Sequence, residues 1–104
     1  MTIPDSVESI EGQAFLFCTS LESVTIPASV TSIGEEAFYE CTSLESVTIP
    51  VSVTSIGESA FYQCDSLKEV NYGGTAEQWK QIDIGSDAFP SGVKITDKDD
   101  NVIS

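Results

Sequence analysis

The chain has 104 residues, with 17 Asp or Glu against four Lys and no Arg or His, so its formal net charge at pH 7 is −13. Four cations offer almost no counter-charge to a phosphate backbone, which argues against DNA or RNA binding, and the lack of His removes imidazole catalysis and His-ligated metal sites. A hydrophobic content of 40% suffices for the core of one domain, whereas no apolar run approaches the ~20 residues of a membrane span and the first residues do not resemble a signal peptide.

A 23-residue repeat organises most of the chain. Residues 26–48 and 49–71 are identical at 16 of 23 positions, and residues 3–25 fit the same frame with Gly12 one place late. Eight positions stay apolar in all three units, and in the first unit they are Ile3, Val7, Ile10, Ala14, Phe15, Cys18, Leu21 and Val24. Because no single unit can bury these side chains, we expect stacked coils that share one core.

The sequence of each unit predicts three short secondary-structure elements. Val47-Thr48-Ile49 alternates with a period of two and is β-branched, so we expect a short strand that ends before Pro50, which cannot donate to a ladder. Residues 53–56 predict a second short strand or extended segment, after which Gly57 breaks the chain direction. Residues 58–64 place apolar side chains at i, i+1 and i+4, which predicts one or two helical turns.

The repeat continues in altered form after residue 71. Residues 84–89 copy residues 56–61 with a displacement of 28 rather than 23, so five residues are added. The spacing from Phe89 to Val93 is four, against nine from Phe61 to Val70, so five residues are removed again. We therefore expect the strand positions of the fourth coil to remain 23 residues from those of the third.

The inserted residues predict a helix that covers the open end of the stack. Thr75 and Gln78 have the spacing of a capping box. Ala76, Trp79 and Ile82 form an apolar stripe, with Lys80 on the outer side. A large aromatic on a terminal helix is what a capping unit requires.

Two segments follow from this division, namely three 23-residue repeats in residues 1–71, and a modified fourth repeat with a C-terminal cap in residues 72–104. The charge changes at the same boundary. The first segment holds 11 acids and one Lys, and the second holds six acids and three Lys.

The combined pattern C-x-S-L-x-x-V-x-I-P-x-S-V-x-x-I-G-x-x-A-F-x-x-C, seen in residues 41–64, resembles the 23-residue leucine-rich repeats of BspA-like (treponemal-type) surface proteins. Residues 72–84 resemble the unit that commonly closes such arrays in gut bacteria. The similarity covers about residues 3–96. It implies an α/β solenoid: a right-handed leucine-rich-repeat superhelix with a short parallel sheet on the concave side, short helical turns and a modified C-terminal capping coil. Such arrays are usually longer, so the chain is expected to be the C-terminal part of a larger protein.

The resemblance also implies a function. Such proteins are secreted or surface-anchored in bacteria, bind host or bacterial surface molecules, and share no enzymatic activity, cofactor or catalytic residues. We therefore expect a non-catalytic binding module, extracellular or on the cell surface, that contacts a protein or glycan through its concave face. The alternative is a structural spacer or cap of a longer array that forms a homo-oligomer through its open N-terminal coil, because exposed apolar side chains and unpaired strand edges favour association.

The expected binding surface consists of the outward strand positions. One predicted ladder holds Ser23, Ser46, Glu69 and Gly92, a second holds Thr25, Thr48, Asn71 and Lys94, and beside them run Glu22, Glu45, Lys68 and Ser91. The candidate binding residues are Ser23, Thr25, Ser46, Thr48, Lys68, Glu69, Asn71 and Lys94. The alternative is that these polar side chains bind no partner and only make the exposed face of the sheet compatible with water.

Two further patterns have structural interpretations. Cys18, Cys41 and Cys64 recur at one inward position, and without CxxC spacing or His they favour a core ladder over a disulfide, a metal site or a nucleophile. Residues 97–101 begin like a calcium loop, D-x-D-x-N, but Val102 stands where such a loop needs Gly, and no Glu follows at position twelve. A polar turn between residues 93–96 and 102–103 is the simpler prediction, so no metal site is expected.

The aromatic and paired acidic residues have similar interpretations. Leu16, Tyr39 and Tyr62 form a predicted ladder beside Phe15, Phe38 and Phe61. Together with Trp79 these rings favour packing between coils and under the cap over a sugar-binding platform. The Glu35-Glu36 pair favours a solvated surface over glycosidase chemistry, because no pocket is implied.

Overall fold

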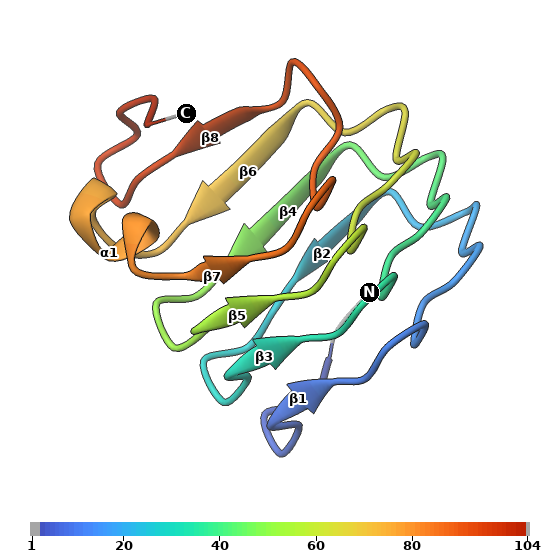
Figure 1. Cartoon of the computed structure of the whole chain (residues 1–104), viewed down its shortest axis with the longest axis horizontal. Coiled ribbons are helices and arrows are strands. Elements are labelled where there is room, and N and C mark those ends of the chain that lie inside the picture. The colour runs from blue at the N-terminus through green and yellow to red at the C-terminus, as the bar shows by residue number, and fades with distance from the viewer. Residues whose placement is uncertain (1–2, 104) are drawn as a thin grey trace.

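Two parallel four-stranded sheets run along the stack of coils, as Figure 1 shows. The computed structural model describes residues 3–103. One sheet has the order β1-β3-β5-β7, with β1 at Ser9–Ile10, β3 at Ser32–Ile33, β5 at Ser55–Ile56 and β7 at Asp83–Ile84. The other, the long-strand sheet, has the order β2-β4-β6-β8, with β2 at Ser23–Thr25, β4 at Ser46–Ile49, β6 at Glu69–Tyr72 and β8 at Lys94–Thr96.

The first three coils repeat with the predicted spacing of 23 residues. Ser23 pairs with Ser46 and Ser46 with Glu69 in the long-strand sheet, while Ile10 pairs with Ile33 in the other. The second short strand of each unit is thereby confirmed at two residues in length. Because both strands of a coil pair with those of the next, the chain forms a β-solenoid of about four coils.

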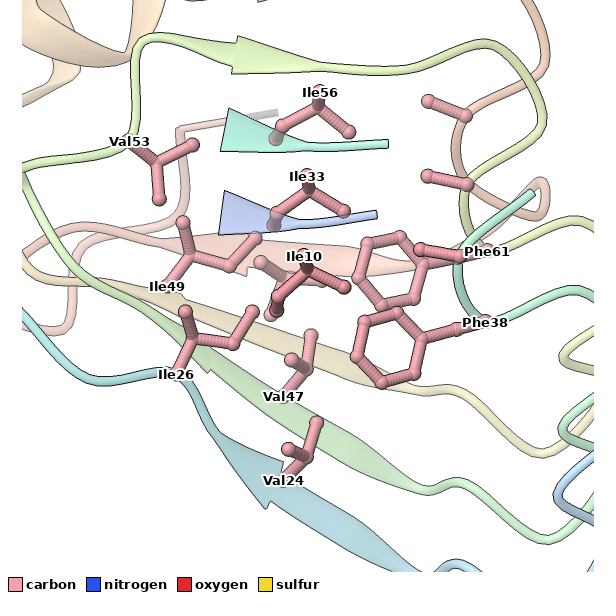
Figure 2. Packing of buried hydrophobic residues seen from close by; sticks show 14 of the residues in the cluster. Ile10, Val24, Ile26, Ile33, Phe38, Val47, Ile49, Val53, Ile56 and Phe61 are labelled. Atoms are coloured by element: carbon pink, nitrogen blue, oxygen red, sulfur yellow. The ribbon is translucent and has the colours of Figure 1, made fainter. Parts of the chain in front are cut away.

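Equivalent apolar side chains stack in columns between the two sheets. Figure 2 shows Ile10, Ile33 and Ile56 lying one above another from one sheet. The phenylalanines form a continuous column, because the ring centroids of Phe15–Phe38, Phe38–Phe61 and Phe61–Phe89 lie 4.9, 5.0 and 5.1 Å apart with nearly parallel planes. Phe38 and Phe61 are completely buried. The core therefore forms only when coils stack on each other.

The predicted helical turns are wrong. Residues 58–63 form successive tight turns, in which Ser59 and Gln63 have φ angles of 57° and 58°. These left-handed conformations interrupt any helix. Alternate amides instead hydrogen-bond to the neighbouring coil, as when the Phe38 N–H donates to the Ala60 carbonyl over 2.7 Å. The apolar spacing that suggests one face of a helix therefore arises in a series of turns whose amides hydrogen-bond to the neighbouring coil.

The fourth coil agrees with the expectation in one sheet and differs in the other. Ser55 pairs with Asp83, so the displacement of 28 residues is confirmed there. Val70 pairs with Ile95 rather than with Val93, so the displacement in the long-strand sheet is 25 and the predicted 23 is wrong. The segment of the fourth coil that leads from β7 to β8 is therefore three residues shorter than its equivalent in the third coil, rather than five. Since a shift of two residues keeps every side chain on the same face, alternation alone does not distinguish the two registers.

The inserted helix caps the fourth coil. Helix α1 spans Ala76–Lys80, and the predicted capping box is present, with Thr75 and Gln78 bonding each other's backbone amides. Trp79 is buried against Tyr72 at 5.0 Å and Phe89 at 6.0 Å between ring centroids. The aromatic contact under the cap is thus confirmed. Within residues 3–103, no helix is long and apolar enough to cross a bilayer.

Candidate binding surface

Strand alternation turns the polar side chains of the long-strand sheet outward. Val24, Val47 and Val70 are almost fully buried, whereas their strand neighbours on either side are exposed or half-buried. The sequence thus alternates Val with Ser, Thr, Glu or Asn because one face of the sheet packs on the core and the other meets solvent. We call the solvent-facing side of the long-strand sheet the outer face.

The structure brings all eight predicted binding residues to the outer face or its border. The first ladder runs Ser23–Ser46–Glu69–Lys94, and the second runs Thr25–Thr48–Asn71–Thr96. Lys68 lies just before β6, where its N–H donates to the Glu45 carbonyl over 3.0 Å. The surface is therefore a continuous row of hydroxyls that gives way to mixed charge at the last two strands.

Two positions in these ladders differ from the prediction. Lys94 lies beside Glu69, where Gly92 was expected, and Thr96 takes the place beside Asn71 that was assigned to Lys94. Thr96 is buried, and its hydroxyl donates to Asn71 Oδ1 over 3.1 Å. Because Asn71 is engaged in this way, its amide is the most constrained of the candidate groups.

The charged groups of the outer face are free of ion pairs within residues 3–103. The one salt bridge there joins Lys98 Nζ to Asp99 over 3.1 Å, in the turn after β8. Lys68, Glu69 and Lys94 are all exposed. Their charges are therefore available to a partner, and the two lysines adjoin the Ser and Thr rows of an otherwise acidic chain.

The cysteines form the predicted core column. Cys41 and Cys64 are fully buried, and their thiols donate to the carbonyls of Phe15 and Phe38 over 3.2 and 3.0 Å. Cys18 is half-buried, and all three are free thiols. A hydrogen bond with the Cys41 thiol, together with burial, raises the pKa of the Cys64 thiol. The Cys64 thiol is thus a protonated packing group rather than a reactive thiolate.

The D-x-D-x-N segment forms the predicted polar turn. Asp97 Oδ1 accepts the amides of Asp99 and Asn101 over 2.9 and 3.0 Å, and Thr96 forms an antiparallel bridge with Val102. The Asn101 amide, followed by that of Asp99, lowers the pKa of the Asp97 carboxyl. Within residues 3–103, no group of three or more His, Cys, Asp or Glu is placed to hold a metal ion.

The surface aromatics lie closer to solvent than predicted. Tyr39 and Tyr62 are neighbours at 5.5 Å between centroids, as the ladder requires, but Tyr62 is 38% exposed. Phe17, which the sequence prediction missed, is 56% exposed and contacts Tyr39 edge-on at 6.1 Å. No part of the 23-residue pattern marks Phe17, because its equivalents in later coils are Glu40 and Gln63.

Comparison with known proteins supports this architecture. The protein-family model described as BspA type leucine rich repeat region (6 copies) matches residues 1–98. No curated protein matches the chain. Among solved structures, a leucine rich cell surface protein from Faecalibacterium prausnitzii A2-165 is 36% identical with a TM-score of 0.75, covering 85% of this chain and 22% of its own.

Two further solved structures agree. The Treponema pallidum leucine rich repeat protein is 26% identical with a TM-score of 0.70, and the match covers 93% of this chain and 50% of that one. A leucine-rich repeat protein from Bacteroides ovatus ATCC 8483 is 32% identical with a TM-score of 0.65, covering 93% of this chain and 29% of its own. The chain therefore spans half or less of the length of each of these proteins. It belongs to the BspA type leucine-rich repeat family.

Proposed function

We propose that this chain is a non-catalytic binding module of a bacterial cell-surface protein, and that it contacts a protein or glycan on a host or bacterial surface. The outer face of the long-strand sheet supports this proposal. Its polar side chains lie in register along the stack at strand steps of roughly 4.8 Å, so a partner meets Ser and Thr hydroxyls on β2 and β4 and charged or amide groups beside them on β6. The description of the Faecalibacterium relative as a cell surface protein supports the location.

Charge determines how a partner is held on this surface. Lys68, Glu69 and Lys94 are exposed at the C-terminal end of the outer face and form no ion pair within residues 3–103. A partner that pairs with these groups gains both affinity and orientation. The Ser and Thr rows then provide hydrogen bonds over the rest of the contact.

A binding array with charge variants tests the outer face. Glycans and matrix proteins are screened with the wild-type chain, with Lys68→Glu/Lys94→Glu, and with Lys80→Glu/Lys98→Glu as a control. Both double variants change the net charge equally, but Lys80 and Lys98 lie on the cap and in the C-terminal turn. We expect the first variant to lose at least tenfold in affinity and the control to lose little. Equal losses, or binding unchanged in both, would sink the outer-face assignment.

A second candidate function is self-association through the N-terminal coil. This end carries an apolar cleft of about 290 Å³ lined by Ile3, Val7, Ile10, Ala14 and Phe15 among others. Phe15 is only half-buried, whereas Phe38 and Phe61 are completely covered. β1 and β2 also pair on one side only within the described residues. A second copy presents the same edges and the same apolar cleft, so two chains can form a symmetric contact.

Sedimentation across concentrations tests the second candidate. Val7→Lys puts a charge in the cleft, while Val51→Lys makes the same change at an exposed position of the third coil. We expect a dimer that strengthens with added salt, because two acidic coils face each other, and that Val7→Lys abolishes. A wild-type chain that remains monomeric at the highest concentration refutes self-association and leaves the outer-face proposal intact.

A further inference from the structure

The shortened fourth coil leaves a cleft at the edge of the stack, away from the outer face. Its turn is three residues shorter than that of the third coil, so the third coil is uncovered at that edge. A cleft of about 400 Å³ results, lined by Tyr62, Gln63, Asp65, Asp87, Phe89 and Ser91 among others. We call it the terminal cleft. Its volume falls in the range of about 300–1,000 Å³ typical of small-ligand sites.

Two aromatic columns of the fold end in the terminal cleft. Phe89 is the last ring of the buried phenylalanine column and stacks on Phe61 at 5.1 Å with planes 9° apart. Tyr62 is the last ring of the surface column, 5.5 Å from Tyr39. Each ring is thus held by the ring before it, and Phe89 is also contacted by Trp79 at 6.0 Å, so Tyr62, which is 38% exposed, offers the freer ring surface in the cleft.

The polar lining of the terminal cleft is acidic and carries no cation. Asp65 and Asp87 both line the cleft and are exposed, together with the Gln63 amide and the Ser91 hydroxyl. Neither carboxylate forms an ion pair within residues 3–103. The position of Asp87 is fixed by its turn, because the adjacent carbonyls of Ser86 and Ala88 accept hydrogen bonds of 2.9 and 2.7 Å from the third coil.

We propose that the terminal cleft binds an organic cation, namely the guanidinium or ammonium group of an Arg or Lys side chain on a partner protein. Aromatic faces attract such cations through their quadrupoles, and the two carboxylates supply charge-assisted hydrogen bonds. The net charge of −13 attracts a cationic group from a distance and repels an anion. A neutral sugar gains from the rings but not from the charge.

A titration followed by amide chemical shifts tests the proposal with two matched small probes. N-acetyl-arginine methylamide carries the cation, and its citrulline analogue has nearly the same shape without the charge. We expect saturable shifts for Gln63, Asp65, Asp87 and Ser91 with the arginine probe, and at least tenfold weaker binding of the citrulline probe. Equal affinity for the two probes, tighter binding of N-acetylglucosamine at the same amides, or no saturation with any of the three overturns the proposal.

Variants separate local recognition from long-range charge. Asp65→Asn/Asp87→Asn is expected to weaken the arginine probe about tenfold, whereas Asp5→Asn/Asp100→Asn, which removes the same charge elsewhere, changes it by less than about twofold. Tyr62→Leu is expected to weaken binding, and Phe17→Leu, which removes an exposed ring two coils away, to leave it nearly unchanged. All six positions lie at the surface, and circular dichroism confirms that each variant folds. Equal effects of the two double variants would show that the cleft confers no specific recognition.

Discussion

Glycine recurs where successive coils approach most closely. A Cβ added to Gly57 would lie 2.4 Å from the Glu35 amide nitrogen, and one added to Gly34 would lie equally close to the Gly12 nitrogen. Among the glycines of residues 3–103, only Gly92 has a φ in the left-handed region. The chain does turn after β5, where this was expected, but Gly57 has no left-handed φ there. Its role is to leave room for the neighbouring backbone, a requirement that depends on how coils stack.

This close contact predicts a large effect of one methyl group. Gly57→Ala is expected to lower the free energy of unfolding by about 1–3 kcal/mol, because the backbone of the adjacent coil must shift. Urea unfolding monitored by Trp79 fluorescence measures the change. Gly73→Ala is the control, because its Cβ would meet its nearest neighbours at an ordinary 3.6 Å, and we expect a change within about 0.5 kcal/mol. Equal stabilities of the two variants would refute the close-approach account.

Elements were predictable to the extent that they depend on local chemistry. The alternation around Val47 and the capping-box spacing from Thr75 to Gln78 both have local physical causes, and both elements are present. The turns that follow β1, β3 and β5 were not predictable as turns, because alternate amides in them hydrogen-bond to a neighbouring coil rather than within the segment. The register of β8 was missed for the same reason, since Ile95 and Val93 both satisfy the alternation and only long-range packing selects Ile95.

The cap predicts a moderate effect at one residue. Thr75→Ala removes the hydroxyl that accepts the Gln78 amide, and we expect a loss of about 1 kcal/mol in the free energy of unfolding. Thr75→Ser keeps that oxygen and should restore most of the stability. Urea unfolding of the three proteins gives the comparison. A serine variant as unstable as the alanine variant would mean that Thr75 acts through its methyl group instead.

At the scale of the whole molecule, the acidity belongs to the repeat. Because acids recur with the period, like charges stack on adjacent coils, as for Glu35 and Glu58, whose turns are joined by a 3.0 Å bond from the Glu36 amide to the Glu58 carbonyl. Within residues 3–103 the single salt bridge joins Lys98 to Asp99 in the C-terminal turn and includes none of the repeat acids. The charge distribution and the stack were predictable from the 23-residue spacing. The terminal cleft was not, because it arises where the fourth coil departs from that spacing.

Stacked like charges predict a stability that rises with salt. Raising sodium chloride from low to moderate concentration should increase Tm by a few degrees, since about 1 kcal/mol corresponds to ~4–8 °C in a domain of this size. Glu58→Gln should reduce this response more than Glu77→Gln, which removes an acid from the exposed side of α1. Thermal unfolding at several ionic strengths measures both. A Tm that falls with salt would contradict the repulsion account.

The four lysines test the central claim, that the outer face is the binding surface, most directly. Lys68 and Lys94 lie at the C-terminal end of that face, Lys80 and Lys98 lie on the cap and in the C-terminal turn, and all four are exposed. Amine-reactive labelling with and without a partner identified by the array, followed by mass spectrometry, compares each lysine with itself. We predict that the partner protects Lys68 and Lys94 severalfold and leaves Lys80 and Lys98 unchanged. Protection of Lys80 and Lys98 with continued labelling of the other two would contradict the claim.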